Sequence, residues 1–324
     1  MSPSEVTLTI PLKITVGIGD STPAPAPSEN FTPTLAEEAA RPRSYYEGRT
    51  GYDPDFLEVP VPLPALTDEQ RRNAAKNADA GTEGDPTVLP YTHFSVVMNR
   101  RRQLAYYTVV NIDGAQSADL PRGRDRWYFD SRIAESEQIG EALYRRNALD
   151  RGHLVRRLDP VWGPDRERAN DDSFHFTNCS PQHERFNQGQ DTWQGLENYI
   201  LENADVQERK VTVFTGPVMD EQDPIYKGVR LPLAFWKILA YCKPEKTLAA
   251  AAYILEQGEL IQDMLRFEAA FNAGTYRVEL AHLKDRTGLN FDYLKKHELP
   301  LSSEGLEAGR DRVQVSGSYS NLSL

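Results

Sequence analysis

The chain has 324 residues, 39% of them hydrophobic and 26% charged, which suits one large or two modest domains with a hydrophobic core. Its 48 acidic and 37 basic side chains give a net charge of −11, which argues against a wide basic surface that holds long nucleic acid by charge alone. The sequence lacks a long apolar run and a secretory signal pattern, so we expect a cytoplasmic protein without a membrane partner. Two cysteines, Cys179 and Cys242, indicate reduced thiols.

Residues 1–85 are predicted to form a proline-rich N-terminal extension, since 13 of the 22 prolines fall within residues 1–90. Apolar residues alternate strictly from Val6 to Val16, the period of a half-buried strand, and Pro11 favours an edge position. A stiff linker is expected at 21–28. In 51–66, prolines between apolar residues exclude a helix, so this segment should lie extended across another surface as a wrapping arm.

The extension includes a short polar helix, predicted for 69–79, and is followed by a compact α+β domain over 86–300 and a polar tail at 301–324. Segments rich in β-branched and aromatic residues at 93–98 and 104–112, joined by the polar turn 99–103, predict an antiparallel hairpin. Further strands are expected at 174–177, 210–215, 234–241, 248–255 and 275–278, and helices at 192–203, 260–270 and 280–288.

The charge balance inverts between Arg100 and Arg168. This stretch holds 14 arginines against 11 acidic residues, a net charge of +3 on an acidic chain. Such a local basic surface suits a pocket that handles one or a few phosphates at a time.

Chemically capable side chains cluster within and just after that stretch. They lie in Asp150-Arg-Gly-His153, Thr177–Gln182, Phe186-Asn187 and Trp193–Glu197. Phosphodiester hydrolysis needs a base to activate water, a cation on the phosphoryl oxygens and stabilisation of the leaving alkoxide. His153 is a suitable base at neutral pH. Magnesium keeps most of its waters, so Asn187 would suffice as its protein oxygen while Glu197 holds the waters.

This ordered set of motifs resembles the DNA/RNA non-specific endonucleases of the endonuclease G type, which are ββα-metal nucleases. The resemblance runs from about Tyr91 to His297. It includes Val109–Gly114, Tyr128–Ile133, Asp150–Leu154, Asn178–Gln182, Asn187, Trp193–Glu197, Val213–Pro217 and Thr287–Phe291. It implies a central antiparallel sheet flanked by helices, one hydrated ion, either Mg²⁺ or Mn²⁺, and a homodimer.

The resemblance also implies roles for single residues. The family's general base corresponds to His153, its direct metal ligand to Asn187, and the carboxylate that holds the ion through water to Glu197. Asn178 matches a polar residue close to that centre, and Arg151 matches the arginine beside the base, near the phosphate. An upstream phosphate-binding arginine corresponds to Arg124 or Arg126, and we prefer Arg126.

The expected function is therefore metal-dependent hydrolysis of DNA and RNA with little sequence preference. The alternatives are a phosphatase of small phosphoesters, an inactive member that binds nucleic acid, and an interaction protein that works through its extension. Residues 1–20 could dock onto a partner protein or a second copy by strand addition, or complete an edge of the chain's own sheet.

Overall fold

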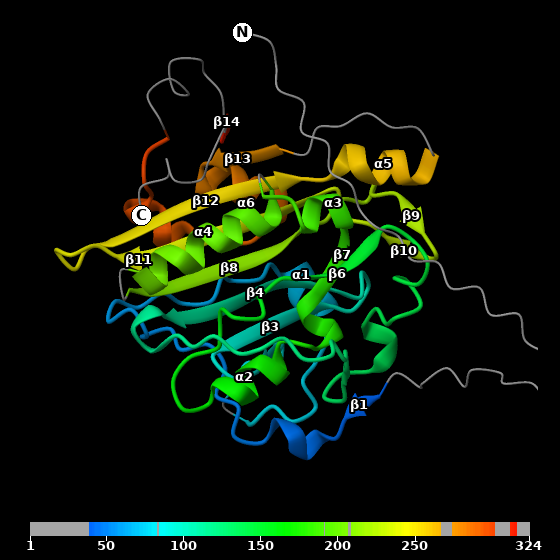
Figure 1. Cartoon of the computed structure of the whole chain (residues 1–324), viewed down its shortest axis with the longest axis horizontal. Helices are drawn as coiled ribbons and strands as arrows, with labels where there is room; N and C mark the ends of the chain where they lie inside the picture. The colour runs from blue at the N-terminus through cyan, green and yellow to red at the C-terminus, as the bar shows by residue number, and fades with distance from the viewer. Residues whose placement is uncertain are drawn as a thin grey trace, which may run out of the picture. The chain divides into compact units, whose positions relative to one another are not determined.

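The computed structural model describes residues 39–82, 84–190, 192–206, 209–266, 274–301 and 312–315. A large sheet of eight strands dominates it, in the order β14-β13-β12-β11-β8-β4-β3-β2, and each neighbouring pair is antiparallel (Figure 1). The strands are β2 (Val88–Pro90), β3 (Phe94–Asn99), β4 (Leu104–Asp113), β8 (Lys210–Val218), β11 (Ala234–Cys242), β12 (Leu248–Glu256), β13 (Gly274–Val278) and β14 (Arg312–Gln314).

The remaining strands form three small two-stranded sheets around the large one. They are β1 (Ala40–Arg41) with β5 (Phe129–Asp130), β6 (Leu149–His153) with β7 (Cys179–His183), and β9 (Ile225–Tyr226) with β10 (Val229–Arg230). The α-helices are α1 (Asp68–Asn73), α2 (Arg166–Asp172), α3 (Glu184–Asn187), α4 (Trp193–Val206), α5 (Gly258–Arg266) and α6 (Leu280–Thr287). In the part of the chain that is described, no helix is long and apolar enough to cross a membrane.

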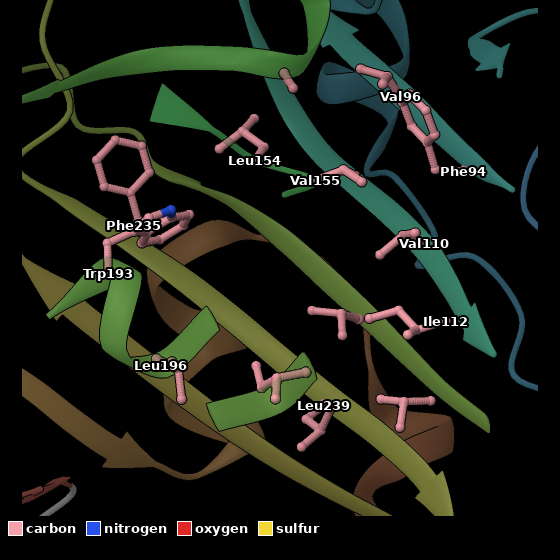
Figure 2. Packing of buried hydrophobic residues seen from close by; sticks show 14 of the residues in the cluster. Phe94, Val96, Val110, Ile112, Leu154, Val155, Trp193, Leu196, Phe235 and Leu239 are labelled. Atoms are coloured by element: carbon pink, nitrogen blue, oxygen red, sulfur yellow. The ribbon is translucent and has the colours of Figure 1, made fainter. Parts of the chain in front are cut away.

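Both faces of the large sheet are covered, which explains why its central strands are buried along almost their whole length. Along β11, Phe235 and Leu239 pack on the face that α4 covers, whereas Trp236 and Ile238 pack on the opposite face with α6. Figure 2 shows Trp193 of α4 beside Phe235. The alternation of strand side chains therefore supplies two hydrophobic layers, one on each face.

The arm 51–66 packs against the face opposite α4, as the sequence predicts. Tyr52, Leu57 and Val61 are buried there among side chains of β4, β8 and β11. Contrary to the expectation, the arm is not extended throughout: residues 54–57 form a turn, and the backbone nitrogen of Val61 donates to the carbonyl oxygen of Pro54 at 2.8 Å. The Tyr52 hydroxyl donates a hydrogen bond of 2.6 Å to the carbonyl oxygen of Val61, which closes this loop.

A ββα unit lies beside the α4 face of the large sheet. The hairpin of β6 and β7 pairs His153 with Cys179, and the chain continues from β7 into α3 and then α4 (Figure 1). Gly152 is required where β6 passes the buried side chain of Gln182 on β7, because a Cβ there would lie 2.0 Å from Oε1 of Gln182. The unit places the end of β6 next to α3 and to the first turns of α4.

Most predicted elements are confirmed, but two are wrong. The segment 174–177 is not a strand: a 3₁₀ turn over Phe176–Asn178 precedes β7, because the Asn178 side chain bonds to the backbone of Val155 and Ser173 and bends the chain. The predicted helix 69–79 ends at Asn73, because Ala74 and the residue after it add to the edge of β3. The predicted strand 6–16 lies outside the described residues.

Candidate active site

A polar cleft of about 580 Å³ opens where the ββα unit meets α4. Four of the predicted site residues, Arg151, His153, Asn187 and Glu197, line it together although they come from three different elements. The cleft is also lined by Arg122, Asp125, Trp127, Asp150, Arg156, Arg157, Leu158, Gln188 and Gln194. The sequence-predicted set is thus largely assembled at one place.

His153, the last residue of β6, packs its ring against two aromatic side chains that also contact each other. Its ring centroid lies 4.7 Å from that of Trp127 and 5.2 Å from that of Phe174, and the Trp127 and Phe174 centroids are 5.5 Å apart. Burial, together with the charges of nearby arginines and against the opposing charge of Asp125, lowers the pKa of His153 to about 3. The imidazole is therefore neutral at physiological pH. Its Nε2 is buried without a hydrogen-bond partner in the described structure, so the ring is not committed to a structural network.

Asn187, the last residue of α3, is oriented by Asp150 of β6. Its Nδ2 donates a hydrogen bond of 2.9 Å to Oδ2 of Asp150, and Nε2 of Gln188 donates to the same oxygen at 2.9 Å. A carboxylate accepts hydrogen bonds and cannot donate them, which assigns the amide nitrogen of Asn187 to Asp150. The amide oxygen of Asn187 is then the atom that remains to bind a cation.

Glu197 projects from α4 and pairs with a lysine buried beneath it. Lys237 of β11 is 1% exposed, and its Nζ lies 3.3 Å from Oε1 of Glu197 and 3.2 Å from Oγ1 of Thr215. Nζ also lies 4.1 Å from the ring centroid of Trp193. Burial raises the pKa of Glu197 above its ordinary value, although the charge of Lys237 opposes this shift.

Asp159 is a second buried carboxyl near Glu197. Burial, and then the negative charge of Glu197, raise the pKa of Asp159 to about 7, while Arg156 and Lys237 oppose the rise. A carboxyl with this pKa is partly protonated at neutral pH. Asp159 does not line the cleft, and it adds less than a full negative charge near Glu197.

Arg151, which follows Asp150 on β6, lines the cleft but is already paired. Its Nη1 lies 2.8 and 2.7 Å from the two carboxylate oxygens of Glu141, and both side chains are about one-third exposed. This pair fixes the direction of the arginine beside His153. A phosphate at Arg151 would have to share the guanidinium with Glu141.

Asn178 does not line the cleft and instead holds the loop that follows His153. It is fully buried, and its Oδ1 accepts a hydrogen bond of 2.9 Å from the backbone nitrogen of Val155. Its Nδ2 donates to the carbonyl oxygens of Val155 and Ser173, both at 3.0 Å. Among the described residues its contacts are thus those of a positioning residue, which differs from the expected place close to the metal centre.

Arg126 also lies outside the cleft. It lines a separate pocket of about 180 Å³ together with Arg124, its competitor for the upstream phosphate role. The cleft is lined instead by Arg122, whose guanidinium pairs with Asp125. Of these three arginines, Arg122 thus lines the cleft, whereas Arg124 and the preferred candidate, Arg126, line the neighbouring pocket.

Sequence reasoning missed several cleft residues that bear charge. Burial lowers the pKa of Arg157, and the positive charges of Arg122 and Arg156 lower it further. These like charges repel one another, and an anion bound among them would relieve the repulsion. The excess of arginine in residues 100–168 indicated such a cluster. It did not show which of the 14 arginines there would line the cleft.

Replacing Lys237 with methionine is expected to destabilise the protein by about 3–5 kcal/mol, because Glu197 would then be a buried carboxylate without its cation. Chemical unfolding at pH 7 measures this loss. The double variant Lys237→Met, Glu197→Gln should recover most of it, since neither charge is then left alone. If the double variant lost as much stability as the single one, packing of the lysine stem rather than charge pairing would be responsible.

The β6-β7-α3 unit with a neutral histidine at its strand end, opening into an arginine-lined cleft, defines the class of ββα nucleases. The model of the family described as DNA/RNA non-specific endonuclease matches residues 72–297 of this chain. The chain belongs to this family. The family membership that the sequence motifs indicated is confirmed.

Two individual relatives are similar to the chain. An uncharacterised protein, y4fB, of Sinorhizobium fredii (strain NBRC 101917 / NGR234) is 45% identical over 233 residues, which are 69% of this chain and 35% of the relative. This chain thus spans about a third of the length of that relative. A chain in the crystal structure of the EndoG/EndoGI complex is 19% identical with a TM-score of 0.49, over 66% of this chain and 89% of that chain.

Proposed function

We propose that this chain is a metal-dependent endonuclease that hydrolyses internal phosphodiester bonds of DNA and RNA with little sequence preference. The observation that supports this most is the neutral His153, packed against Trp127 and Phe174 beside a cluster of arginines. A neutral imidazole is a base, and arginines bind phosphate oxygens. Together they can activate water next to a bound phosphodiester.

In this proposal His153 accepts the proton of the attacking water. Trp127 and Phe174 pack against its ring, and His153 lines the cleft, where a water could reach it. Arg122 and Arg157 line the same cleft and would donate N–H groups to the phosphoryl oxygens, Arg122 by sharing its guanidinium with Asp125. Charge that builds on these oxygens during attack strengthens those hydrogen bonds, which lowers the barrier.

The residues present suit a hydrated divalent ion. Asn187 offers one neutral oxygen, fixed in direction because Asp150 accepts from the amide nitrogen. Glu197 lines the same cleft and would hold waters of the ion. Mg²⁺ prefers oxygen ligands and retains several waters, so we propose Mg²⁺ at this place, with Mn²⁺ as an alternative. When bound, such an ion supplies Lewis-acid stabilisation of charge on the phosphoryl and leaving oxygens.

Incubation of supercoiled plasmid and of a structured RNA with the protein, in magnesium or in chelator, tests the proposal. We expect metal-dependent nicking followed by fragmentation of both substrates. Hydrolysis of small phosphomonoesters without any nicking would favour the phosphatase alternative. Binding without cleavage in any divalent metal would favour an inactive nucleic-acid-binding member.

Other expectations remain predictions. These are the cytoplasmic location, the homodimer, the division into 1–85, 86–300 and 301–324, and docking of residues 1–20 on a protein partner. Deleting residues 1–28 and measuring plasmid cleavage, mass in solution and melting temperature tests the last of them. A lowered melting temperature at unchanged mass and unchanged regulation would mean that the deleted strand is part of the fold.

A further inference from the structure

A second pocket adjoins the His153 cleft and is lined mainly by arginines. Arg41, Arg124, Arg126 and Arg157 line it, against a single carboxylate, that of Asp171. Arg157 lines both the pocket and the cleft, so the two are neighbours. Four cations against one anion give this pocket a lining charge of +3 on a chain whose net charge is −11. Arg124 and Arg126 are exposed to solvent and Arg41 is half-buried, so the lining attracts an anion without requiring one.

Three of these arginines lack an acidic partner. Among the residues that the structure describes, the guanidinium groups of Arg41, Arg124 and Arg126 form no hydrogen bond or ion pair. Nε of Arg41 is moreover buried from solvent without an acceptor. A buried donor that lacks an acceptor costs free energy, and an anion in the pocket would supply one.

Aromatic rings fix the guanidinium of Arg41. Its Cζ lies 3.8 Å from the ring centroid of Tyr128 and 4.6 Å from that of Tyr45. Cζ of Arg126 lies 5.2 Å from the same Tyr128 ring. Stacking of this kind holds the plane of a guanidinium and leaves its N–H edge for a planar, two-point contact with phosphate.

The backbone of Arg41 is also held in place. Strand β1 pairs in parallel with β5, with Arg41 opposite Asp130. A few residues further on, the Tyr45 hydroxyl donates a hydrogen bond of 2.7 Å to Asp172, and the Tyr46 hydroxyl lies 3.0 Å from Nε2 of His175. These contacts anchor the segment before the family match, which begins at residue 72. The position of Arg41 is therefore built into the fold.

We propose that Arg41, with Arg124, Arg126 and Arg157, forms a second phosphate-binding subsite that holds a backbone phosphate of the nucleic acid next to the one in the cleft. This inference rests on the proposed nuclease function. It assigns part of substrate binding to a segment outside the family's matched region. Phosphate contacts of this type add affinity without reading sequence, which agrees with cleavage at little sequence preference.

Equilibrium binding of a fluorescent 20-base-pair DNA tests the subsite, in chelator and over a series of salt concentrations. Arg41→Gln should weaken binding roughly 5- to 10-fold and reduce the slope of log affinity against log salt by about 1, the amount expected for one lost phosphate contact. Arg41→Lys keeps the charge and should restore the slope. Arg124→Gln, which leaves β1 untouched, should reproduce the loss of slope even if Arg41→Gln disturbed the fold.

Arg43→Gln is the matched control, because Arg43 is exposed on the same segment, pairs with Asp79 and does not line the pocket. The proposal is overturned if Arg41→Gln and Arg124→Gln both retain the wild-type slope, or if Arg43→Gln loses as much as they do. A wild-type protein that neither binds nor cuts nucleic acid would instead overturn the proposed function. Intact cleavage with unchanged slopes in the variants would overturn the subsite alone.

Discussion

His153→Ala is expected to lower kcat on plasmid DNA by about 100-fold or more while leaving the affinity for DNA nearly unchanged. General-base groups contribute about 10²–10⁴-fold, and they act in the transition state rather than in substrate binding. Single-turnover cleavage and filter binding measure the two quantities separately. A variant that kept more than about a tenth of the wild-type rate would exclude the role of His153 as base.

Chemical rescue sharpens this test. The alanine variant leaves a space beside Trp127 and Phe174 where the imidazole ring packed. Added imidazole should therefore restore part of the lost rate in His153→Ala. His297→Ala is the control, since His297 lies in the 3₁₀ segment Asp292–His297 and does not line the cleft, and it should neither lose the rate nor respond to imidazole.

The pH dependence follows from the lowered pKa of His153. A base works when it is unprotonated, so kcat/KM should rise with pH through this pKa and then level off. Burial holds the pKa below the ordinary value of 6.5, so we expect the rise to be complete below about pH 6.5 and the profile to be flat from there to pH 8. A midpoint above 7 that disappears in His153→Ala would contradict this environment for the imidazole.

Asn187→Ala is expected to raise the magnesium concentration needed for half-maximal activity by more than Glu197→Gln does. Asn187 offers the direct oxygen, whereas Glu197 would act through water, and partners that act outside the direct ligands typically contribute about 10- to 100-fold. Metal titrations of activity and calorimetry of magnesium binding measure the order. If Glu197→Gln were the worse variant for metal affinity, the two roles would be reversed.

Asp150, the carboxylate that orients Asn187, provides a second test of magnesium binding at Asn187. Asp150→Asn replaces an acceptor by a group that can also donate, so the Asn187 amide is no longer held in one direction. We expect weaker magnesium binding with little loss of thermal stability. Gln190→Ala is the control, because Gln190 is exposed near the same turn and does not line the cleft.

Much of the fold and of the site follows from local sequence. Short apolar runs bounded by polar turns predicted the β3-β4 hairpin and the central strands, because strands covered on both faces have nearly continuous apolar sequences. The order of Asp150-Arg-Gly-His153, Asn187 and Glu197 indicated one centre, and these residues do line one cleft. Local sequence also gave one wrong strand, at 174–177. The side chain of Asn178 donates hydrogen bonds to the backbone of Val155 and Ser173, and the chain forms a turn there instead.

Contacts between distant residues were decided by the tertiary structure. Lys237 reads as an interruption in an apolar strand, and only packing of α4 on β11 brings it within 3.3 Å of Glu197, 40 residues away in sequence. Arg41 likewise meets Tyr128 because β1 pairs with β5. Residue type and spacing can select one histidine as the candidate base. They cannot choose among arginines of equal chemistry, because the direction of a long side chain depends on which surface the fold places beside it.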